Sequence, residues 1–276
     1  MAAGVDLARY FERIAFAGAA APDLATLREL HRLHPIAIPF ENLSTLLREP
    51  IPLDIAALQD KLVFSGRGGY CFEHNGFFAE ILRALGFEVA GLAARVVWSR
   101  PAGPLGPRTH MVLRVQIGAD AYLADVGFGG LTLTAPLRLT PGVEQVTPHE
   151  TFRLRRAGEE LELEARVQDE WRALYRFDLQ EQQPVDFEVL NHFVATHASS
   201  PFLTTLMAAR RSADGRYALT DGELTIYRGT LKESRTLRSA AEVERVLAET
   251  FRVALPRGPA LDEVLAAAAA KQVREV

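Results

Sequence analysis

Residues 67–76 read RGGYCFEHNG, a glycine-rich turn that runs directly into a predicted helix. The apolar residues after the turn repeat at helical spacing, which indicates one buried face: Phe72, Phe78, Ile81, Leu82 and Leu85. Gly86 favours the left-handed backbone that closes many helices, so we expect this helix to end there. The pattern therefore places Cys71, the one cysteine of the chain, in the first turn of a helix.

The segments before this turn are also predicted to be helical. Asp23 opens a run whose apolar residues follow a 3.6-residue period, and Pro35 and Pro39 are expected to end it. Asp54 is the expected N-cap of another short helix over residues 55–62. The amino-terminal part of the chain is therefore predicted to be a helical unit.

After Gly86 the periodicity changes to that of strands. β-Branched and aromatic residues alternate or cluster over residues 89–98, 111–117, 122–126, 152–154, 161–167 and 171–177. Consecutive strands without helices between them favour an antiparallel sheet or a small barrel over a doubly wound parallel sheet. A helical pattern returns over residues 184–197, and the remainder predicts one hairpin and two helices. We therefore predict an α+β protein of three units: a helical unit over residues 1–86, a β unit over 87–198 and a mixed unit over 199–276.

Composition narrows the class of function. The 276 residues carry 31 lysines and arginines against 35 aspartates and glutamates, a net charge of −4 that is too weak to recruit nucleic acid or anionic lipid. No apolar run approaches the roughly 20 residues of a membrane-spanning helix, and charges near the amino terminus exclude a secretory signal. A single cysteine excludes an internal disulfide and a multi-cysteine metal site. We therefore expect a cytoplasmic protein with a small-molecule partner and no metal.

Cys71 is the first candidate for chemistry. Helix N-termini favour the thiolate, which is the nucleophilic form of cysteine. The alternative is a small buried apolar residue, which describes most lone cysteines. The residues Gly68 and Gly69, which lack side chains, favour a catalytic role because they are expected to let a substrate approach the sulfur.

A thiolate needs a base that becomes imidazolium, and His110 lies in a predicted strand soon after the helix. A two-residue turn at Gly118-Ala119 would place His110 opposite Gly127, one diagonal step from Asp125 on the same face. Diagonal neighbours lie roughly 7 to 8 Å apart, within reach of an imidazole and a carboxylate. A three-residue loop would send the two side chains to opposite faces. With the shorter turn the sequence predicts a Cys71, His110 and Asp125 triad.

These residues lie in motifs that resemble those of the arylamine N-acetyltransferases. Residues 67–76 resemble the active-site signature of that family, and Pro39-Phe40-Glu41-Asn42-Leu43 resembles its upstream motif. Thr109-His110-Met111 resembles the histidine strand, and residues 125–130 (DVGFGG) resemble the aspartate motif. Residues 191–202 resemble a later motif, so the resemblance extends in order from about residue 35 to 202.

The resemblance implies a fold and a set of roles. The fold is a helical bundle, an antiparallel β-barrel and an α/β lid around a papain-like and transglutaminase-like core. Cys71 would be the acetylated nucleophile, His110 its base and Asp125 the orienting carboxylate. Arg67 and Glu41 would form a buried ion pair that supports the active-site turn.

The resemblance also implies binding residues. The acceptor pocket would include Phe128, Phe202 and Tyr70. Coenzyme A would be received by Trp98, Thr109, Gly127, Gly129 and Gly130. From the residues alone, Trp98 is equally well an aromatic residue at a strand end. Residues 127–130 are more simply explained as a bend at a strand end than as a phosphate-binding loop.

The implied reaction is acetyl transfer from acetyl-coenzyme A to an aromatic amine or hydrazine through an acetyl-cysteine, with ping-pong kinetics. Backbone N–H groups at the start of the Cys71 helix would stabilise the oxyanion. The alternative is a cysteine hydrolase or transglutaminase-like amidase with the same triad. The natural acceptor, the preferred acyl chain and the oligomeric state are left open.

Two further histidine patterns have simpler explanations. His31 and His34 have a spacing that zinc can use, but no third ligand is evident nearby, so we expect ordinary packing. His74 lies one turn after Cys71 and is expected to pack or to hydrogen-bond rather than to catalyse.

Overall fold

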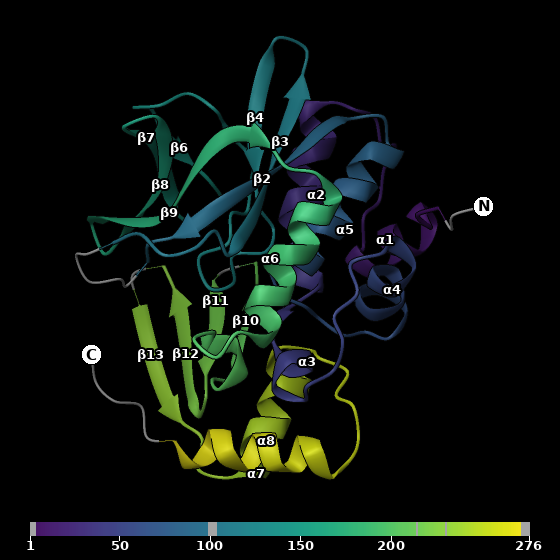
Figure 1. The fold of residues 1–276 in the computed structure, drawn as a ribbon, viewed down its shortest axis with the longest axis vertical. Helices are drawn as coiled ribbons and strands as arrows, with labels where there is room; N and C mark the ends of the chain where they lie inside the picture. The colour runs from purple at the N-terminus through teal and green to yellow at the C-terminus, as the bar shows by residue number, and fades with distance from the viewer. Residues whose placement is uncertain (1–3, 99–103, 214, 230, 272–276) are drawn as a thin grey trace.

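The computed structural model describes residues 4–98, 104–213, 215–229 and 231–271. Figure 1 shows helices on one side of a curved barrel and a second, smaller sheet below, with two helices at its end. The amino-terminal elements are α1 (Leu7–Ile14), α2 (Leu24–Ala37), β1 (Phe40–Glu41), α3 (Leu43–Leu46), α4 (Ile55–Gln59), the π-turn η1 (Asp60–Phe64) and α5 (Cys71–Ala84). Within the described residues, no helix is long and apolar enough to cross a membrane.

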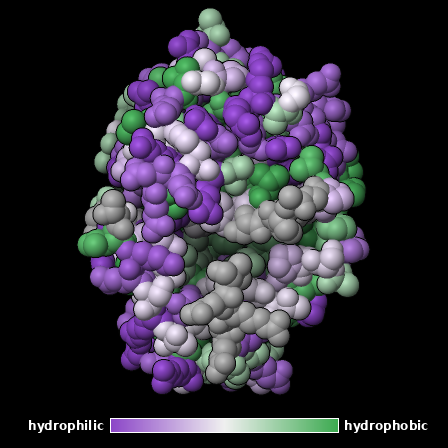
Figure 2. Space-filling model, turned by 90° about the vertical axis from the view of Figure 1, so that its left-hand side faces the viewer, coloured by the Kyte–Doolittle hydropathy of each residue, from purple (hydrophilic) through white to green (hydrophobic). Residues whose placement is uncertain are grey.

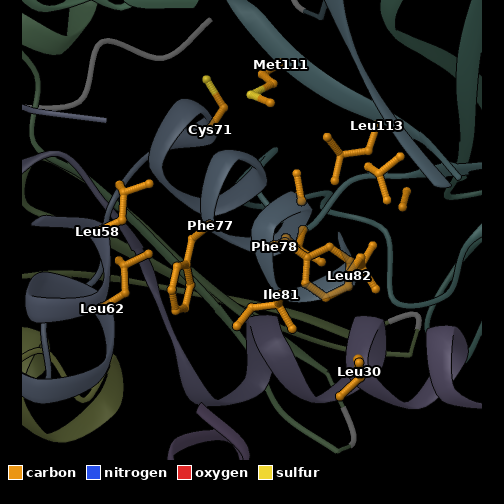
Figure 3. Close-up of a cluster of buried hydrophobic side chains, with 14 of the residues drawn as sticks. Leu30, Leu58, Leu62, Cys71, Phe77, Phe78, Ile81, Leu82, Met111 and Leu113 are labelled. Carbon is orange, nitrogen blue, oxygen red and sulfur yellow. The ribbon is translucent and has the colours of Figure 1, made fainter. Parts of the chain in front are cut away.

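Helix α5 is the centre of the helical part. Its apolar face packs against α2, η1 and the barrel strands, and Figure 3 shows Phe77, Phe78, Ile81 and Leu82 directed into this cluster. The helix ends as predicted. Gly86 has a φ of 89°, its N–H donates to Arg83 (2.9 Å), and the next N–H donates to Leu82 (3.0 Å).

The expected end of α2 at Pro35 is wrong. The helix continues through Pro35 to Ala37, and the N–H of Ile38 still donates to the carbonyl of His34 (2.8 Å). Proline removes one hydrogen bond, but the buried faces of Leu30 and His34 hold this last turn against the core. Pro39, the second expected terminator, follows the helix end.

The β part is an antiparallel sheet of eight strands in the order β5-β4-β3-β2-β9-β8-β7-β6, closed nearly into a barrel. Its strands are β2 (Glu88–Val96), β3 (His110–Ile117), β4 (Asp120–Ala124), β5 (Leu137–Arg138), β6 (Glu144–Val146), β7 (Thr151–Ala157), β8 (Glu160–Val167) and β9 (Glu170–Glu181). The amide side chain of Gln145 on β6 joins the open edges, because it accepts from the N–H of Arg138 (2.8 Å) and donates to its carbonyl (2.9 Å) on β5.

The remaining elements form a five-stranded sheet with helices. They are α6 (Pro184–Thr196), η2 (Pro201–Leu203), β10 (Met207–Arg211), β11 (Arg216–Thr220), β12 (Glu223–Arg228), β13 (Leu231–Thr236), α7 (Ala240–Arg245), the π-turn η3 (Val246–Thr250) and α8 (Pro259–Ala270). The first strand of this sheet is β1, from the amino-terminal part, which pairs with β10. Phe187 and Val194 of α6 pack into the helical cluster. The division into units at residues 86 and 198 stays a prediction.

Candidate active site

Cys71 occupies the first turn of α5, as the sequence predicts. Its side chain is only 4% exposed, and its Sγ lies 3.6 Å from the carbonyl oxygen of Thr109, at the start of β3. Figure 3 shows it beside Met111, where the helix meets this strand. The first N–H groups of a helix have no partner within it. Here the carboxylate of Glu73, in the first turn of α5, accepts from the N–H before the helix, that of Tyr70 (3.0 Å).

His110 and Asp125 meet because of the predicted turn. Ile117 pairs with Asp120 across a two-residue turn, and the register continues to Leu113 and Ala124. Beyond it, His110 Nε2 lies 2.7 Å from Asp125 Oδ2, and both side chains are buried. The other ring nitrogen, Nδ1, remains for the sulfur of Cys71.

The electrostatics of this pair favour an imidazolium. Burial disfavours a charge on His110, but the Asp125 carboxylate and hydrogen bonds to Asp125 and Cys71 outweigh it and raise the pKa of His110 to about 10. Burial likewise disfavours the Asp125 carboxylate, yet the charge of His110 and hydrogen bonds hold its pKa below the usual value. At neutral pH the pair is therefore a buried ion pair.

Asn75 is a residue that sequence reasoning missed. Its amide nitrogen donates to Asp125 Oδ1 (2.9 Å) and to the carbonyl of Met111 (2.7 Å), and its amide oxygen accepts from the N–H of Val126 (3.0 Å). One side chain thus ties α5 to both segments that carry the histidine and the acid. The signal was present, since Asn75 follows Cys71 by four residues and shares its helix face.

The expected ion pair of Arg67 and Glu41 is present. Arg67 Nε lies 2.9 Å from Glu41 Oε1, and Glu41 Oε2 accepts from the N–H of Leu43 (2.7 Å). The charge of Arg67 holds the pKa of the buried Glu41 carboxyl below its usual value, although burial alone would raise it. The pair joins the active-site turn to β1 and, through the N–H of Leu43, to the start of α3.

The expected reason for Gly68 and Gly69 is wrong. A Cβ on Gly68 would lie 2.0 Å from the carbonyl oxygen of Pro39, and one on Gly69 would lie 2.7 Å from the Glu73 carboxylate. Protein atoms, not a substrate, fill the space beside these two residues. The glycines allow the turn to pack against the residue before β1 and against its own helix cap.

The histidines around the site are buried and hydrogen-bonded, as expected for His74. His74 Nε2 donates to the carbonyl of Pro39 (3.1 Å), its Nδ1 accepts from His34 Nε2 (2.9 Å), and His34 Nδ1 accepts from Tyr10 (3.0 Å). Because the carbonyl of Pro39 can only accept, His74 must carry its proton on Nε2. Its Nδ1 must then accept from His34 Nε2, which fixes the tautomer of His34 as well. Burial lowers the pKa of His74 to about 4.

His31 is hydrogen-bonded to the backbone of Asp125. Its Nε2 accepts from the backbone N–H of Asp125 (3.0 Å), and burial lowers the pKa of His31 to about 4. This contact joins residues 94 positions apart, and no feature of the sequence points to it.

Comparison with known proteins agrees with this geometry. A family model described as N-acetyltransferase matches residues 23–259. The chain is 44% identical over 251 residues to the arylamine N-acetyltransferase of Mycobacterium tuberculosis, which covers 90% of this chain and 89% of that protein. It is 44% identical over 247 residues to the arylamine N-acetyltransferase of Escherichia coli, at 89% and 88% coverage.

The chain belongs to the arylamine N-acetyltransferase family. The solved structure of Mycobacterium marinum arylamine N-acetyltransferase in complex with CoA matches with a TM-score of 0.91 and 43% identity, covering 95% of this chain and 98% of that chain. The α+β fold with an antiparallel barrel and a cysteine-enzyme core, expected from the resemblance, is confirmed.

The predicted acceptor residues of this family member are aromatic, and one of them, Phe128, lies beside His110. The ring of Phe128 lies 5.2 Å from that of His110, and Tyr175, which the sequence did not single out, contacts both rings. Phe202 lies 5.6 Å from Tyr70. Tyr70 is 1% exposed and donates its hydroxyl hydrogen to Asn191 of α6, so its side chain joins α5 to α6.

Three of the predicted coenzyme residues are glycines in the loop that follows Asp125. A Cβ on Gly127 would lie 3.0 Å from Asn75, Cys71 and His74 atoms, so only glycine lets this loop approach α5. Gly129 has a φ of 86° and faces the ring of Phe40. The carbonyl of Gly130 accepts from Arg216 (3.0 Å). Close packing explains Gly127 and the positive φ explains Gly129, whereas a side chain would fit at Gly130. The role of all three in binding coenzyme A stays a prediction.

The other two predicted coenzyme residues lie at the ends of strands. Thr109 immediately precedes β3, and its carbonyl faces the sulfur. Trp98 is 36% exposed and immediately precedes residues 99–103, which lie outside the described part of the chain. Figure 2 shows that one face of the molecule is hollowed near its centre, with apolar side chains at the rim.

The carboxyl-terminal sheet holds the loop that follows Asp125. Arg211 of β10, which is 1% exposed, pairs with Glu150 (2.9 Å) and donates to the carbonyl of Thr132 (2.6 Å). Arg216 of β11 donates to Gly130 in the same loop. Two guanidinium groups from one sheet thus fix the backbone on either side of Leu131, next to Phe128.

Proposed function

We propose that this protein transfers an acetyl group from acetyl-coenzyme A to the nitrogen of aromatic amines or hydrazines, with Cys71 as the nucleophile. The observation that carries the proposal is the buried His110–Asp125 ion pair beside a cysteine at a helix N-terminus. The names of the relatives support the same acyl acceptor, and the CoA complex of the Mycobacterium marinum relative supports the same donor.

In the first half-reaction, Cys71 attacks the thioester carbonyl. The imidazolium of His110 stabilises the thiolate, and N–H groups in the first turn of α5 stabilise the oxyanion of the tetrahedral intermediate. When the intermediate collapses, the bond from carbon to the coenzyme sulfur breaks and coenzyme A leaves as a thiolate that takes the proton of His110. The acetyl group remains on Cys71, and His110 is neutral.

In the second half-reaction, the amine attacks the acetyl carbon. Neutral His110 takes the proton that the nitrogen loses, and Asp125 stabilises the imidazolium that results. The carbon–sulfur bond to Cys71 breaks as the second intermediate collapses. The thiolate and imidazolium of the resting enzyme are then restored, so the protons balance over one cycle.

The need for a neutral nucleophile explains aromatic acceptors. Arylamines and aryl hydrazines are weak bases and are unprotonated at neutral pH, whereas alkyl amines are mostly ammonium ions without a free electron pair. Phe128 and Phe202 are the proposed apolar contacts of the ring. We place coenzyme A along Trp98, Thr109 and residues 127–130. The single cysteine and the donor favour the cytoplasm as the location.

Initial-rate kinetics test the proposal. With aniline as acceptor, double-reciprocal plots against acetyl-coenzyme A should give parallel lines at several fixed amine concentrations. The reason is that coenzyme A leaves, and the acetyl group stays on Cys71, before the amine reacts. Intersecting lines would count against a covalent intermediate. At pH 7 benzylamine, a matched alkyl amine, should be acetylated far more slowly than aniline. Equally fast loss of the thioester with and without amine would identify a hydrolase instead.

A further inference from the structure

A second hollow lies outside the site described above. It is an open cleft of about 490 Å³ between the amino-terminal helices and the carboxyl-terminal part of the chain. It is lined by Arg13 of α1, by residues 63–66 and by residues 248 and 252–254. None of these residues belongs to the triad or to the proposed acceptor and coenzyme contacts. A cleft of this size is in the range of small-molecule sites.

The cleft is positively charged. Arg13 and Arg252 line it, and no lining residue carries a carboxyl group. Within the described residues, neither guanidinium lies within ion-pair distance of a carboxylate, whereas the nearby Arg9 is paired with Glu12. Arg13 donates through Nε to the carbonyl of Leu62 (3.2 Å), which leaves its terminal nitrogens for another acceptor. Burial, and then the charge of Arg252, lower the pKa of Arg13, so the two cations are close enough to repel each other.

One wall of the cleft is apolar. Phe64 is 49% exposed, although most phenylalanines of this chain are buried. The two sides of the cleft are fixed to each other, because the N–H of Ala254 donates to the carbonyl of Gly66 (3.0 Å). Arg252 has a φ of 59°, a left-handed conformation that arginine rarely adopts. The fold thus holds two unpaired guanidinium groups and an exposed ring around one preformed space.

We propose that this cleft binds a small organic anion: a phosphate monoester attached to a flat, apolar group. A guanidinium binds phosphate oxygens in pairs, and two of them match a dianion. The ring of Phe64 matches the flat group. Binding would also satisfy charges that are left unpaired here and would join α1 to the segment after η3.

Titration calorimetry with 1-naphthyl phosphate tests the proposal on the whole protein. We expect saturable one-to-one binding that weakens as salt is raised. Arg252→Asn should weaken it at least tenfold, since asparagine tolerates the left-handed backbone. Arg13→Met, which keeps most of the side-chain packing, should do the same from the other wall. Arg172→Ala, which removes an exposed charge on the barrel, is the matched control and should leave binding unchanged.

Two further measurements separate this site from the acetyl-transfer site. Phe64→Ser should weaken binding of 1-naphthyl phosphate but not that of inorganic phosphate. Saturating dephospho-coenzyme A, which lacks the phosphate monoester of coenzyme A, should leave the affinity for 1-naphthyl phosphate unchanged. Equal affinity of wild type and both arginine variants, or complete displacement by dephospho-coenzyme A, would overturn the proposal. Acetylation of Cys71 is measured separately in the same variants. It tests the proposed function independently of this cleft, because neither arginine lies in the triad.

Discussion

Asn75 shows how much of the site depends on one neutral side chain. It bonds to Asp125 and to the backbone of Met111 and Val126, all buried. Asn75→Ala leaves these groups without partners, so we expect the free energy of unfolding in urea to fall by about 2–4 kcal/mol. Gln182→Ala, which removes a solvent-exposed hydrogen bond from the amide to the carbonyl of Gln180, should change it by less than about 0.5 kcal/mol. An equally small effect of both substitutions would show that Asn75 does not hold the site together.

Asp125 is predicted to act through the charge of His110. In Asp125→Asn the carboxylate that raises the pKa of His110 is gone, so the imidazolium and the Cys71 thiolate are both disfavoured at neutral pH. We expect kcat/KM for acetyl transfer to fall by about 10³–10⁴, as for other triads that lose their acid.

The pH profile distinguishes this role from a structural one. In the variant, the rate of Cys71 acetylation should rise steeply with pH above neutrality, whereas the wild-type rate should be flatter over the same range. Parallel profiles would contradict the assignment, because misfolding alone lowers the rate without changing its dependence on pH.

At the scale of elements, close packing of a loop on α5 sets the geometry. In Gly127→Ala the new Cβ would lie 3.0 Å from the backbone of Cys71 and from the Asn75 and His74 side chains. We expect a loss of about 1–3 kcal/mol in unfolding free energy together with slower acetyl transfer. Gly76→Ala is the control on the same helix. Its nearest neighbour lies 3.7 Å away, and alanine is the better helix former, so stability should be equal or up to about 1 kcal/mol higher.

Local signals predicted the elements that local interactions form. The register of β3 and β4 followed from the two-residue turn at Gly118 and Ala119, and the end of α5 followed from Gly86. The strands β1 and β10 were not predicted. β1 has only two residues, and its partner β10 lies more than 160 residues away, whereas β10 pairs with its neighbour β11 but has only five residues. Neither strand has a hydrophobic alternation long enough to identify it.

At the scale of the whole molecule, the candidate triad was predictable and its surroundings were not. Cys71, His110 and Asp125 stand in recognisable motifs, and a turn of known length joins two of them. The hydrogen bonds of His31 to the N–H of Asp125 and of Arg211 to the carbonyl of Thr132 each join segments that are far apart in the sequence. Such contacts depend on the packing of complete units, which a single sequence does not encode in any local pattern.

Buried histidines make the folded state sensitive to acid. His31 and His74 have pKa values near 4 in the folded chain, against 6.5 for an exposed histidine. Between pH 6.5 and 4 the unfolded chain therefore binds protons that the folded chain excludes, so stability falls as the pH falls and levels off near 4. The limit is about 3 kcal/mol for each. His110 opposes this slope only weakly, because it is protonated in the folded chain and, below its ordinary pKa of 6.5, is also mostly protonated in the unfolded chain.

Urea unfolding at several pH values measures this effect. The free energy of unfolding should decrease by about 1–3 kcal/mol between pH 6.5 and 5, before carboxylates with lowered pKa values, such as Glu41, begin to titrate. A stability that stays constant over this range would mean that these histidines are accessible to protons in the folded protein.

The most direct test of the central claim is the mass of the acyl-enzyme. The protein is incubated with acetyl-coenzyme A and no amine, digested, and analysed by mass spectrometry. We predict one acetyl group on the peptide that carries Cys71, its loss when aniline is added, and no acetylation or transfer by Cys71→Ala. An unmodified Cys71 peptide, or a Cys71→Ala variant that still acetylates aniline, would contradict the account.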